Sequence, residues 1–213
     1  LPSRDGDVPW YGQLGEGITD EKIQALITAG YGYVLNGGAQ STPITGAGAY
    51  VSTTPDMDIQ VADDRAFIPL SILVQCETIG TVSPLEAIAT VGTGGTLATG
   101  GTAVIPRNMD TNRGNTSGLL CQSPASSAVL MTGKAHDIWR DGVPGVSVKT
   151  DSGTVSVKDH PFHFLYSAKA EGIYHILKSD VSGLARLNVW VGHQAMTAFI
   201  IVKGVSVPKD WTT

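Results

Sequence analysis

Cysteine is scarce in this chain, and charged and aromatic residues are few. Only two cysteines, Cys76 and Cys121, occur among 213 residues, which excludes a small secreted scaffold held together by several disulfides. We expect two buried thiols on strands, and the sequence leaves a single bridge between them open. Charged residues make up 15% of the chain, against roughly 25% in an average soluble domain. So small a supply of Lys and Glu argues against a helical bundle.

Positive charge is also lacking, and this limits the classes of partner. The formal net charge is −5, and the 14 Lys and Arg residues are scattered along the chain, so we expect no nucleic-acid partner. Residues 87–106 carry no charge, but Gly and Thr interrupt them too often for a membrane helix. We therefore expect no membrane partner. Residues 1–10 contain Arg4, Asp5 and Asp7 and no apolar run, which is not the pattern of a secretory leader.

Glycine, threonine and serine are abundant, and they favour strands joined by many turns. The chain has 26 glycines and 42% hydrophobic residues, with a mean hydropathy of +0.08. This length and composition are enough to bury a core. No repeat and no change of composition marks a linker. We predict one β-domain over residues 18–213, preceded by an extended arm over residues 1–17.

One short helix is expected, over residues 20–29. Thr19 fits the N-cap, and Gly30 fits the position after the last helical residue. Apolar residues recur at helical spacing on one face: Ile23, Leu26 and Ile27. A helix this short needs a larger surface to pack on. We expect it to cover one end of a β-core, with a partner-binding helix as the alternative.

After Gly30 the pattern of apolar residues changes to a period of two, which is typical of strands. Pro69 predicts an edge position or a bulge near the start of the longest segment. The short spacing of the segments favours antiparallel pairing, so the predicted fold is an all-β antiparallel sandwich or jelly roll. The expected strands cover residues 31–35, 48–53, 58–62, 66–79, 85–91, 102–106, 117–121, 128–132, 137–140, 146–150, 154–157, 163–169, 172–177, 185–191 and 198–202.

The N-terminal arm contains the two residues that we single out as binding residues, Trp10 and Tyr11. Pro2 and Pro9 deny the arm regular structure. Ordering such an arm costs entropy, so a large aromatic anchor is needed to offset that cost. We expect Trp10 and Tyr11 to hold the arm against the chain's own body, another subunit or a shell.

The sequence predicts no phosphate-binding site and no metal site. The Gly-rich residues 92–101 are followed by no Lys and no helix, so they do not form a P-loop. His160 and His163 would face opposite sides of a strand, which does not suit one zinc ion. A group of acidic residues is a candidate for binding calcium: Asp56, Asp58, Asp63 and Asp64. It contains no D-x-D-x-D-G loop, which argues against a calcium site. We expect no metal and no cofactor.

Catalytic patterns are equally weak, so we expect a protein that is not an enzyme. No G-x-S-x-G elbow occurs, and neither cysteine has protease-like surroundings. We weighed Glu77 and Glu86 as an acid–base pair and did not favour them. Tryptophans could hold sugars, but they lie far apart in the sequence: Trp139, Trp190 and Trp211. For Trp190 we favour a place in the core or in a subunit contact.

Several segments share a texture that runs over residues 60–140 and continues in the closing strand. They are Arg65-Ala66-Phe67-Ile68-Pro69-Leu70-Ser71, Thr93-Gly94-Gly95-Thr96, Ala103-Val104-Ile105-Pro106-Arg107-Asn108-Met109, Thr111-Asn112-Arg113 and Ala198-Phe199-Ile200-Ile201-Val202. Together these segments resemble the jelly-roll-type capsid decoration (cement) or head-fibre proteins of tailed bacteriophages.

The resemblance implies a structural role in a virus particle. It implies a homotrimer that is made in the host cytoplasm, sits on the capsid exterior of the virion and binds the major capsid protein, without catalysis. Low charge with abundant Thr, Ser and Gly independently suits large, partly polar subunit contacts. Two alternatives stay open. One is a carbohydrate- or receptor-binding module of a phage fibre, using an exposed site at Trp139, Trp211 or the pair Asp56 and Asp58. The other is a shell-forming jelly-roll capsid protein.

Overall fold

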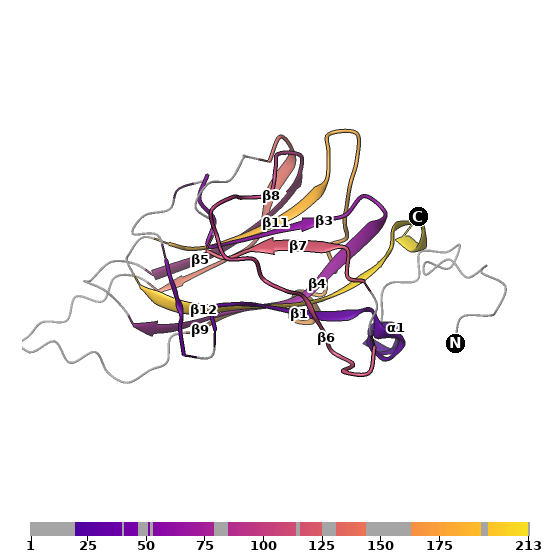
Figure 1. The fold of residues 1–213 in the computed structure, drawn as a ribbon, viewed down its shortest axis with the longest axis horizontal. Helices are drawn as coiled ribbons and strands as arrows, with labels where there is room; N and C mark the ends of the chain where they lie inside the picture. The colour runs from indigo at the N-terminus through magenta and orange to yellow at the C-terminus, as the bar shows by residue number, and fades with distance from the viewer. Residues whose placement is uncertain are drawn as a thin grey trace, which may run out of the picture.

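Two antiparallel β-sheets face each other and enclose an apolar interior (Figure 1). The computed structural model describes residues 20–39, 41–46, 51, 53–78, 85–113, 116–124, 131–143, 163–192 and 196–212. The predicted all-β antiparallel sandwich is confirmed, and jelly-roll connectivity stays a prediction. The arm over residues 1–17 lies outside the described residues, together with Trp10 and Tyr11.

The first sheet, called sheet I, has the strand order β10-β4-β12-β1-β6, with β9 also paired to β4 and β2 to β12. The second, sheet II, has the order β7-β3-β11-β5-β8. Sheet I consists of β1 (Gly32–Gly37), β2 (Ile44–Thr45), β4 (Arg65–Thr78), β6 (Arg107–Asn108), β9 (His163–Ser167), β10 (Leu177–Lys178) and β12 (Thr197–Pro208). Sheet II consists of β3 (Met57–Val61), β5 (Leu85–Thr93), β7 (Leu119–Gln122), β8 (Gly133–Val143) and β11 (Ala185–Gly192).

The core lies between the sheets and follows from the period of two along each strand. On β12, Ala198, Ile200 and Val202 are fully buried, whereas the residues between them are only half-buried. Because alternate side chains point to opposite faces of a strand, these three meet the inward residues of sheet II. The main facing residues are Met57, Ile59, Val61, Leu187 and Val189.

A second, smaller apolar cluster lies on the outer face of sheet I, under helix α1 (Asp20–Leu26). Ile23 and Leu26 of the helix are buried there against Val205 and Val207 of β12. The helix continues as one π-helical turn, η1 (Ile27–Tyr31), in which Gly30 has a left-handed φ of 88°. The helix was predicted over residues 20–29, and its expected role as a cover for one end of the β-core is confirmed.

The predicted bulge near Pro69 is present. Ser71 of β4 pairs with Lys203 of β12, whereas Pro69 pairs with the very next residue, Gly204, so Leu70 is left over. On the other side of β4, β9 pairs with residues 71–75 and β10 with residues 66–67. Pro69 therefore stands where its missing N–H breaks no ladder with either strand.

Some strand predictions were wrong in detail. The strand expected over residues 172–177 is mostly loop, because Gly172 (φ 70°) ends a short helix, α2 (Ala168–Glu171), in the left-handed conformation. Residues 102–106 form one isolated bridge, Ala103 to Gln122. Residues 137–140 belong to the longer strand β8. The strands expected over residues 146–150 and 154–157 lie outside the described residues, as do most of those expected over 48–53 and 128–132.

The described chain ends in a 3-10 helix, η2 (Lys209–Thr212). Its Trp211 packs edge-on against Tyr31, with ring centroids 5.1 Å apart. Among the described residues, no helix is both long and apolar enough to cross a membrane.

Candidate functional site

The Gly-rich segment between β5 and β6 covers part of the outer face of sheet II. Strands β3 and β11 are consequently buried on both faces, including their polar residues Asp58, Gln60, Arg186 and Asn188. Figure 1 shows the segment crossing the front of the molecule from sheet II to β6 in sheet I. Gly94 and Gly95 turn the chain at its start, with φ values of 80° and 73°. The Gly-rich stretch that the sequence excluded as a P-loop is thus part of a covering loop.

A buried ion pair holds this loop to the sheet. Arg186 Nε donates to Asp58 Oδ1 at 3.1 Å and Nη2 donates to Oδ2 at 2.5 Å, and both side chains are fully buried. The backbone N–H of Ala98, in the loop, donates to Asp58 Oδ2 at 2.7 Å. With its amide turned to donate, Asn188 reaches Asp58 Oδ1 at 2.7 Å. Asp58 is therefore saturated by donors, which gives it a structural role.

The other acidic candidates for calcium have partners of their own, including Asp64, which lies 3.8 Å from Arg65 Nε. Asp56 accepts a hydrogen bond from the backbone N–H of Val191 at 2.6 Å and is buried. Asp63 forms an exposed ion pair with Lys209 at 3.1 Å. Within the described ranges, no group of three or more His, Cys, Asp or Glu side chains is placed to hold a metal ion.

Two histidines approach each other at the edge where the sheets meet. The rings of His136, on β8, and His175, in the loop after α2, have centroids 6.2 Å apart. His136 Nδ1 lies 2.9 Å from the carbonyl oxygen of Lys134. Burial lowers the pKa of His175, and the neighbouring His136 lowers it further. His163 is exposed on β9, while His160 and His193 lie outside the described residues.

Both cysteines are free thiols in the core, as the sequence analysis favoured. Cys76 lies on β4 in sheet I, and Cys121 lies on β7 in sheet II. Burial raises the pKa of the Cys76 thiol to about 11. Burial also raises the pKa of Cys121, and the Asp58 carboxylate adds to the effect. Thiols held in this form are poor nucleophiles.

The residues considered for an exposed glycan site are buried or half-buried. Trp139 is buried against Tyr166, and Asp56 and Asp58 are buried as well. Trp211 is half-buried against Tyr31. The expectation of an exposed site is wrong for Trp139, Asp56 and Asp58, which are buried. For the half-buried Trp211 it stays a prediction. Trp190 is buried, as expected, but on the outer face of sheet II, because its neighbours Val189 and Val191 face the core. Its Nε1 donates to the carbonyl oxygen of Val51 at 3.0 Å.

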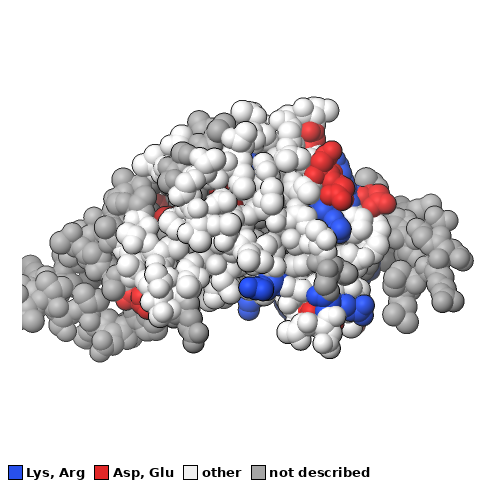
Figure 2. Space-filling view, in the orientation of Figure 1, with Lys and Arg blue, Asp and Glu red and all other residues white. Residues whose placement is uncertain are grey.

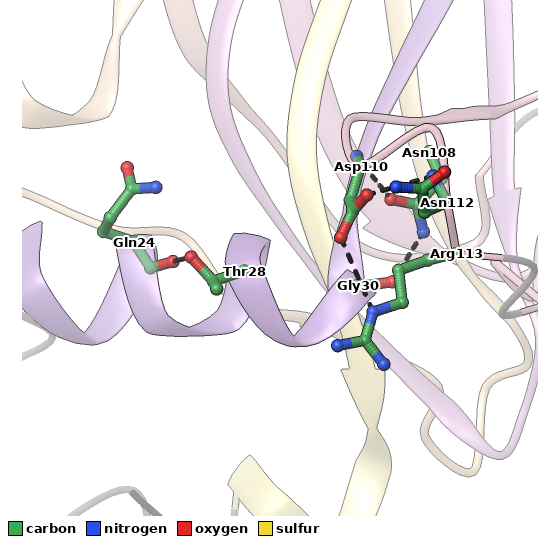
Figure 3. A network of polar contacts seen from close by, with 7 residues as sticks. All are labelled: Gln24, Thr28, Gly30, Asn108, Asp110, Asn112 and Arg113. Carbon is green, nitrogen blue, oxygen red and sulfur yellow. Dashed lines mark hydrogen bonds and ion pairs between the residues drawn. The ribbon is translucent and has the colours of Figure 1, made fainter.

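A polar network at the end of η1 ties the helix to β6 (Figure 3). Asn108 Nδ2 donates to the carbonyl oxygen of Gly30 at 2.6 Å. The turn after β6 closes on itself, because Asp110 N donates to Asn108 Oδ1 at 2.8 Å and Asn112 N donates to Asp110 Oδ1 at 3.0 Å. Arg113 completes it with an ion pair to Asp110 at 3.5 Å. The polar groups of this network bond to one another, so the network fixes the helix in place.

A groove of about 690 Å³ opens between the end of β1 and the segment that leads into β6. Its polar lining includes Asn36, Thr42 and Arg107, and its apolar lining includes Ile44 and Ile105. Ile105 is exposed. Figure 2 shows few charged side chains over the middle of the molecule on the face that it presents. The groove therefore suits a neutral or weakly charged ligand.

The outer face of sheet I is covered by helix α1 at only one end. Beyond the bulge at Leu70, the outward side chains of β4, β9 and β12 include Leu73, Leu165, Phe199 and Ile201. Leu165 is 53% exposed, and the other three are half-buried. No described helix or strand packs over them, although the Phe199 ring lies against Gly38 in the turn after β1. We call this region the open half-face.

Sequence reasoning missed the two features that organise this molecule's polar and apolar surfaces. The ion pair of Asp58 with Arg186 joins positions 128 residues apart, so no local sequence pattern predicts it. One signal was available: Arg186 stands between Ala185 and Leu187 in an apolar strand. The open half-face was hidden because its apolar residues alternate as ordinary strands do.

Comparison with known proteins does not name a class beyond this architecture. The chain matches no protein-family model, no curated protein and no solved structure. The fold and the geometry described above define an antiparallel β-sandwich with one half-covered outer face.

Proposed function

We propose that this chain is a structural protein of a bacteriophage virion, an oligomeric β-sandwich that decorates and stabilises the outside of the capsid. The observation that carries the proposal is the open half-face of sheet I, where the apolar side chains of Leu73, Leu165 and Ile201 lie outward with no described helix or strand over them. Contiguous exposed apolar surface marks an interaction site. A partner that covers it excludes water and gains the free energy of apolar burial.

The buried polar groups support a structural role rather than a chemical one. Asp58, Arg186 and Asn188 bond to one another and to the covering loop. Catalysis needs groups that are open to a substrate. The partners proposed are further copies of this chain, as a homotrimer, and the major capsid protein, with Trp10 and Tyr11 of the arm as added contacts. The chain would be made in the host cytoplasm and end on the virion exterior.

The test is to look for the chain in particles. Purified virions from the producing host are analysed by quantitative mass spectrometry, before and after removal of loosely bound protein. We expect the chain in a fixed ratio to the major capsid protein, with loss of particle stability to heat when the gene is deleted. Virions that lack the chain, in a lysate that contains it, contradict the proposal. Empty shells assembled by the purified chain alone favour the shell-forming alternative.

The groove beside β1 supports a second candidate, a receptor- or carbohydrate-binding module. Its volume lies within the range of roughly 300–1,000 Å³ that small-ligand sites occupy. Asn36 and Thr42 offer hydrogen-bonding groups, and Arg107 offers a charged donor. A glycan array distinguishes this candidate. Binding that is lost in Asn36→Ala but kept in the control Gln75→Ala supports it, and an array without hits removes it.

A further inference from the structure

The pairing register of sheet I places the outward residues of the open half-face in transverse rows. Leu165 of β9 pairs with Leu73 of β4, and Leu73 pairs with Ile201 of β12. These three aliphatic residues form one apolar row across three strands. In the next row, two residues along, Gln75 pairs with Phe199. Cross-strand neighbours on one face lie within contact distance, so the apolar row is continuous.

Opposite charges stand at the two ends of these rows. On the side nearer helix α1, the next row holds Lys203, paired with Val34, which in turn pairs with Arg107. On the far side, Glu77 is exposed beyond Gln75 on β4. Within the described part of the chain, Lys203, Arg107 and Glu77 form no ion pair with one another or with other residues. The half-face thus has one apolar row and one mixed row in its middle, a basic end and an acidic end; in the mixed row, Gln75 also pairs with the exposed His163 of β9.

We propose that the open half-face binds the same half-face of a second copy of this chain, about a two-fold axis that runs across the strands. This inference rests on the self-association in the proposed function but adds a two-fold contact to it, because such a contact cannot by itself build the homotrimer proposed above; the two contacts together give a hexamer. The axis reverses the strand direction of one copy relative to the other. It therefore brings the basic end of each copy over the acidic end of its partner.

The spacing of the rows determines where the two-fold axis must lie for opposite charges to meet. Alternate residues of a strand lie about 6.7 Å apart, so successive rows have that separation. An axis midway between the Leu73 row and the Gln75 row places each Leu73 row over the partner copy's row of Gln75 and Phe199. The same axis moves the Lys203 row by three row spacings, to the level of Glu77, which a register shift between β4 and β12 leaves without a cross-strand partner. Two symmetric Lys203–Glu77 pairs then flank the apolar centre.

Helix α1 sets the limits of the contact. Packed sheets lie about 10 Å apart, and a helix laid on a sheet forms a layer of about the same depth. The helix over Val205 and Val207 therefore protrudes from the sheet at the basic end. There it limits how far the sheet of the second copy can extend. By symmetry the partner's helix lies beyond Glu77. The protruding helix defines the register between copies and leaves the groove beside β1 at the border of the contact.

The strand edges of sheet II offer a poorer route to self-association. Strand β8 has only β5 as a described neighbour, and its exposed side chains include Lys134, His136, Asp137, Arg140 and Asp141. Its ladder with β5 is interrupted twice by register shifts. Charges and bulges of this kind prevent a strand edge from pairing with another chain. The opposite edge strand of this sheet, β7, is already bonded to residues 102–104. Both edges of sheet II are therefore less suited to a second copy than the open half-face.

The experiment uses the full chain and measures mass by light scattering after size exclusion, with circular dichroism to establish folding. The wild-type chain is expected at an even multiple of its 22.2 kDa: a dimer, or a hexamer where a separate three-fold contact is also present. Leu165→Asp places a charge in the apolar row and is expected to weaken the pairing about tenfold or more. Leu120→Asp is the matched control, because Leu120 is 59% exposed on β7 in the other sheet. It should leave the mass unchanged.

Charge exchange tests the axis itself. Lys203→Glu alone and Glu77→Lys alone place like charges together, so each is expected to weaken the pairing about tenfold. The double variant Lys203→Glu/Glu77→Lys restores opposite charges and should restore it. A mixture of the two single variants should form mixed pairs.

Three outcomes overturn the proposal. The first is a wild-type chain that is monomeric or trimeric at micromolar concentration. The second is an assembly that persists unchanged in folded Leu165→Asp. The third is a chain that stays monomeric alone but needs Leu165 to bind capsids, which assigns the half-face to the shell. Detection of the chain in purified virions tests the proposed function separately from all three.

Discussion

Replacing Arg186 with methionine should cost this protein a large part of its stability. The substitution keeps an unbranched apolar stem and removes the guanidinium that donates twice to Asp58. Asp58 is then a fully buried carboxylate whose charge no cation balances. Removing one partner of a buried ion pair costs about 3–5 kcal/mol. A domain of this size loses roughly 2–4 °C of Tm per kcal/mol, so the expected drop is roughly 6–20 °C.

A double variant separates the cost of the unbalanced charge from the worth of the pair. Asp58→Leu/Arg186→Met removes both charges, and apolar replacement of a buried pair is often neutral. Asp58 also accepts from the backbone N–H of Ala98 at 2.7 Å, however, and that donor would be left unpaired in the interior. An unpaired buried donor costs about 1–3 kcal/mol. The double variant should therefore be more stable than Arg186→Met alone.

The assay is equilibrium unfolding in urea, followed by fluorescence of the buried residues Trp139 and Trp190. Lys209→Met is the matched control, since it removes the exposed ion pair with Asp63. Pairs of that kind contribute about 0–1 kcal/mol. The reasoning is refuted if Arg186→Met loses no more free energy of unfolding than Lys209→Met, or if the double variant is the less stable of the two.

Three further predictions concern the core and its edges. Gly204→Ala should lower the free energy of unfolding by about 1–3 kcal/mol in urea titrations, because a Cβ there would lie 2.5 Å from the Phe67 ring; an unchanged midpoint contradicts the tight packing at this bulge. Cys76 should resist alkylation at pH 8 in the folded chain and react in urea, because burial raises its pKa to about 11; rapid labelling of the native protein would show that the strand opens. The third concerns His175, whose pKa is lowered in the folded chain from 6.5 by burial first and by His136 second. The unfolded chain then binds this proton more tightly, so stability is full above about pH 6.5 and falls as the pH drops below it. His175→Gln should reduce the fall between pH 7 and 5.5 in urea midpoints, and an identical pH profile in this variant contradicts the assignment.

The elements whose pattern is local were predictable from the sequence. Helix α1 could be placed because Gly30 ends it and Ile23 and Leu26 share one face. The bulge at Pro69 could be placed because proline cannot donate to a ladder. Strands β3, β4, β5 and β11 fall close to their predicted ranges, since alternation is a direct consequence of strand geometry. Strand β12 was predicted only over residues 198–202, but it extends to Pro208.

Features that depend on distant segments could not be predicted. Asp58 and Gln60 alternate with apolar residues and therefore read as the solvent side of a strand, but the loop with Ala98 covers them. The end of α2 at Gly172 was read as the start of a strand, because Gly, Ile and Tyr there are also common in strands. The open half-face follows only from knowing which end of sheet I the helix occupies.

The central position of β12 in sheet I has a consequence for how the protein is made. This strand lies between β4 and β1, both of which precede it by a long stretch of sequence. On the ribosome, those two strands emerge with their facing backbone groups unmatched and must wait until β12 has been synthesised. Such late closure slows folding and exposes unpaired strands to aggregation. Expression at low temperature, or together with chaperones, should therefore raise the yield of soluble protein, and truncation before β12 should abolish it.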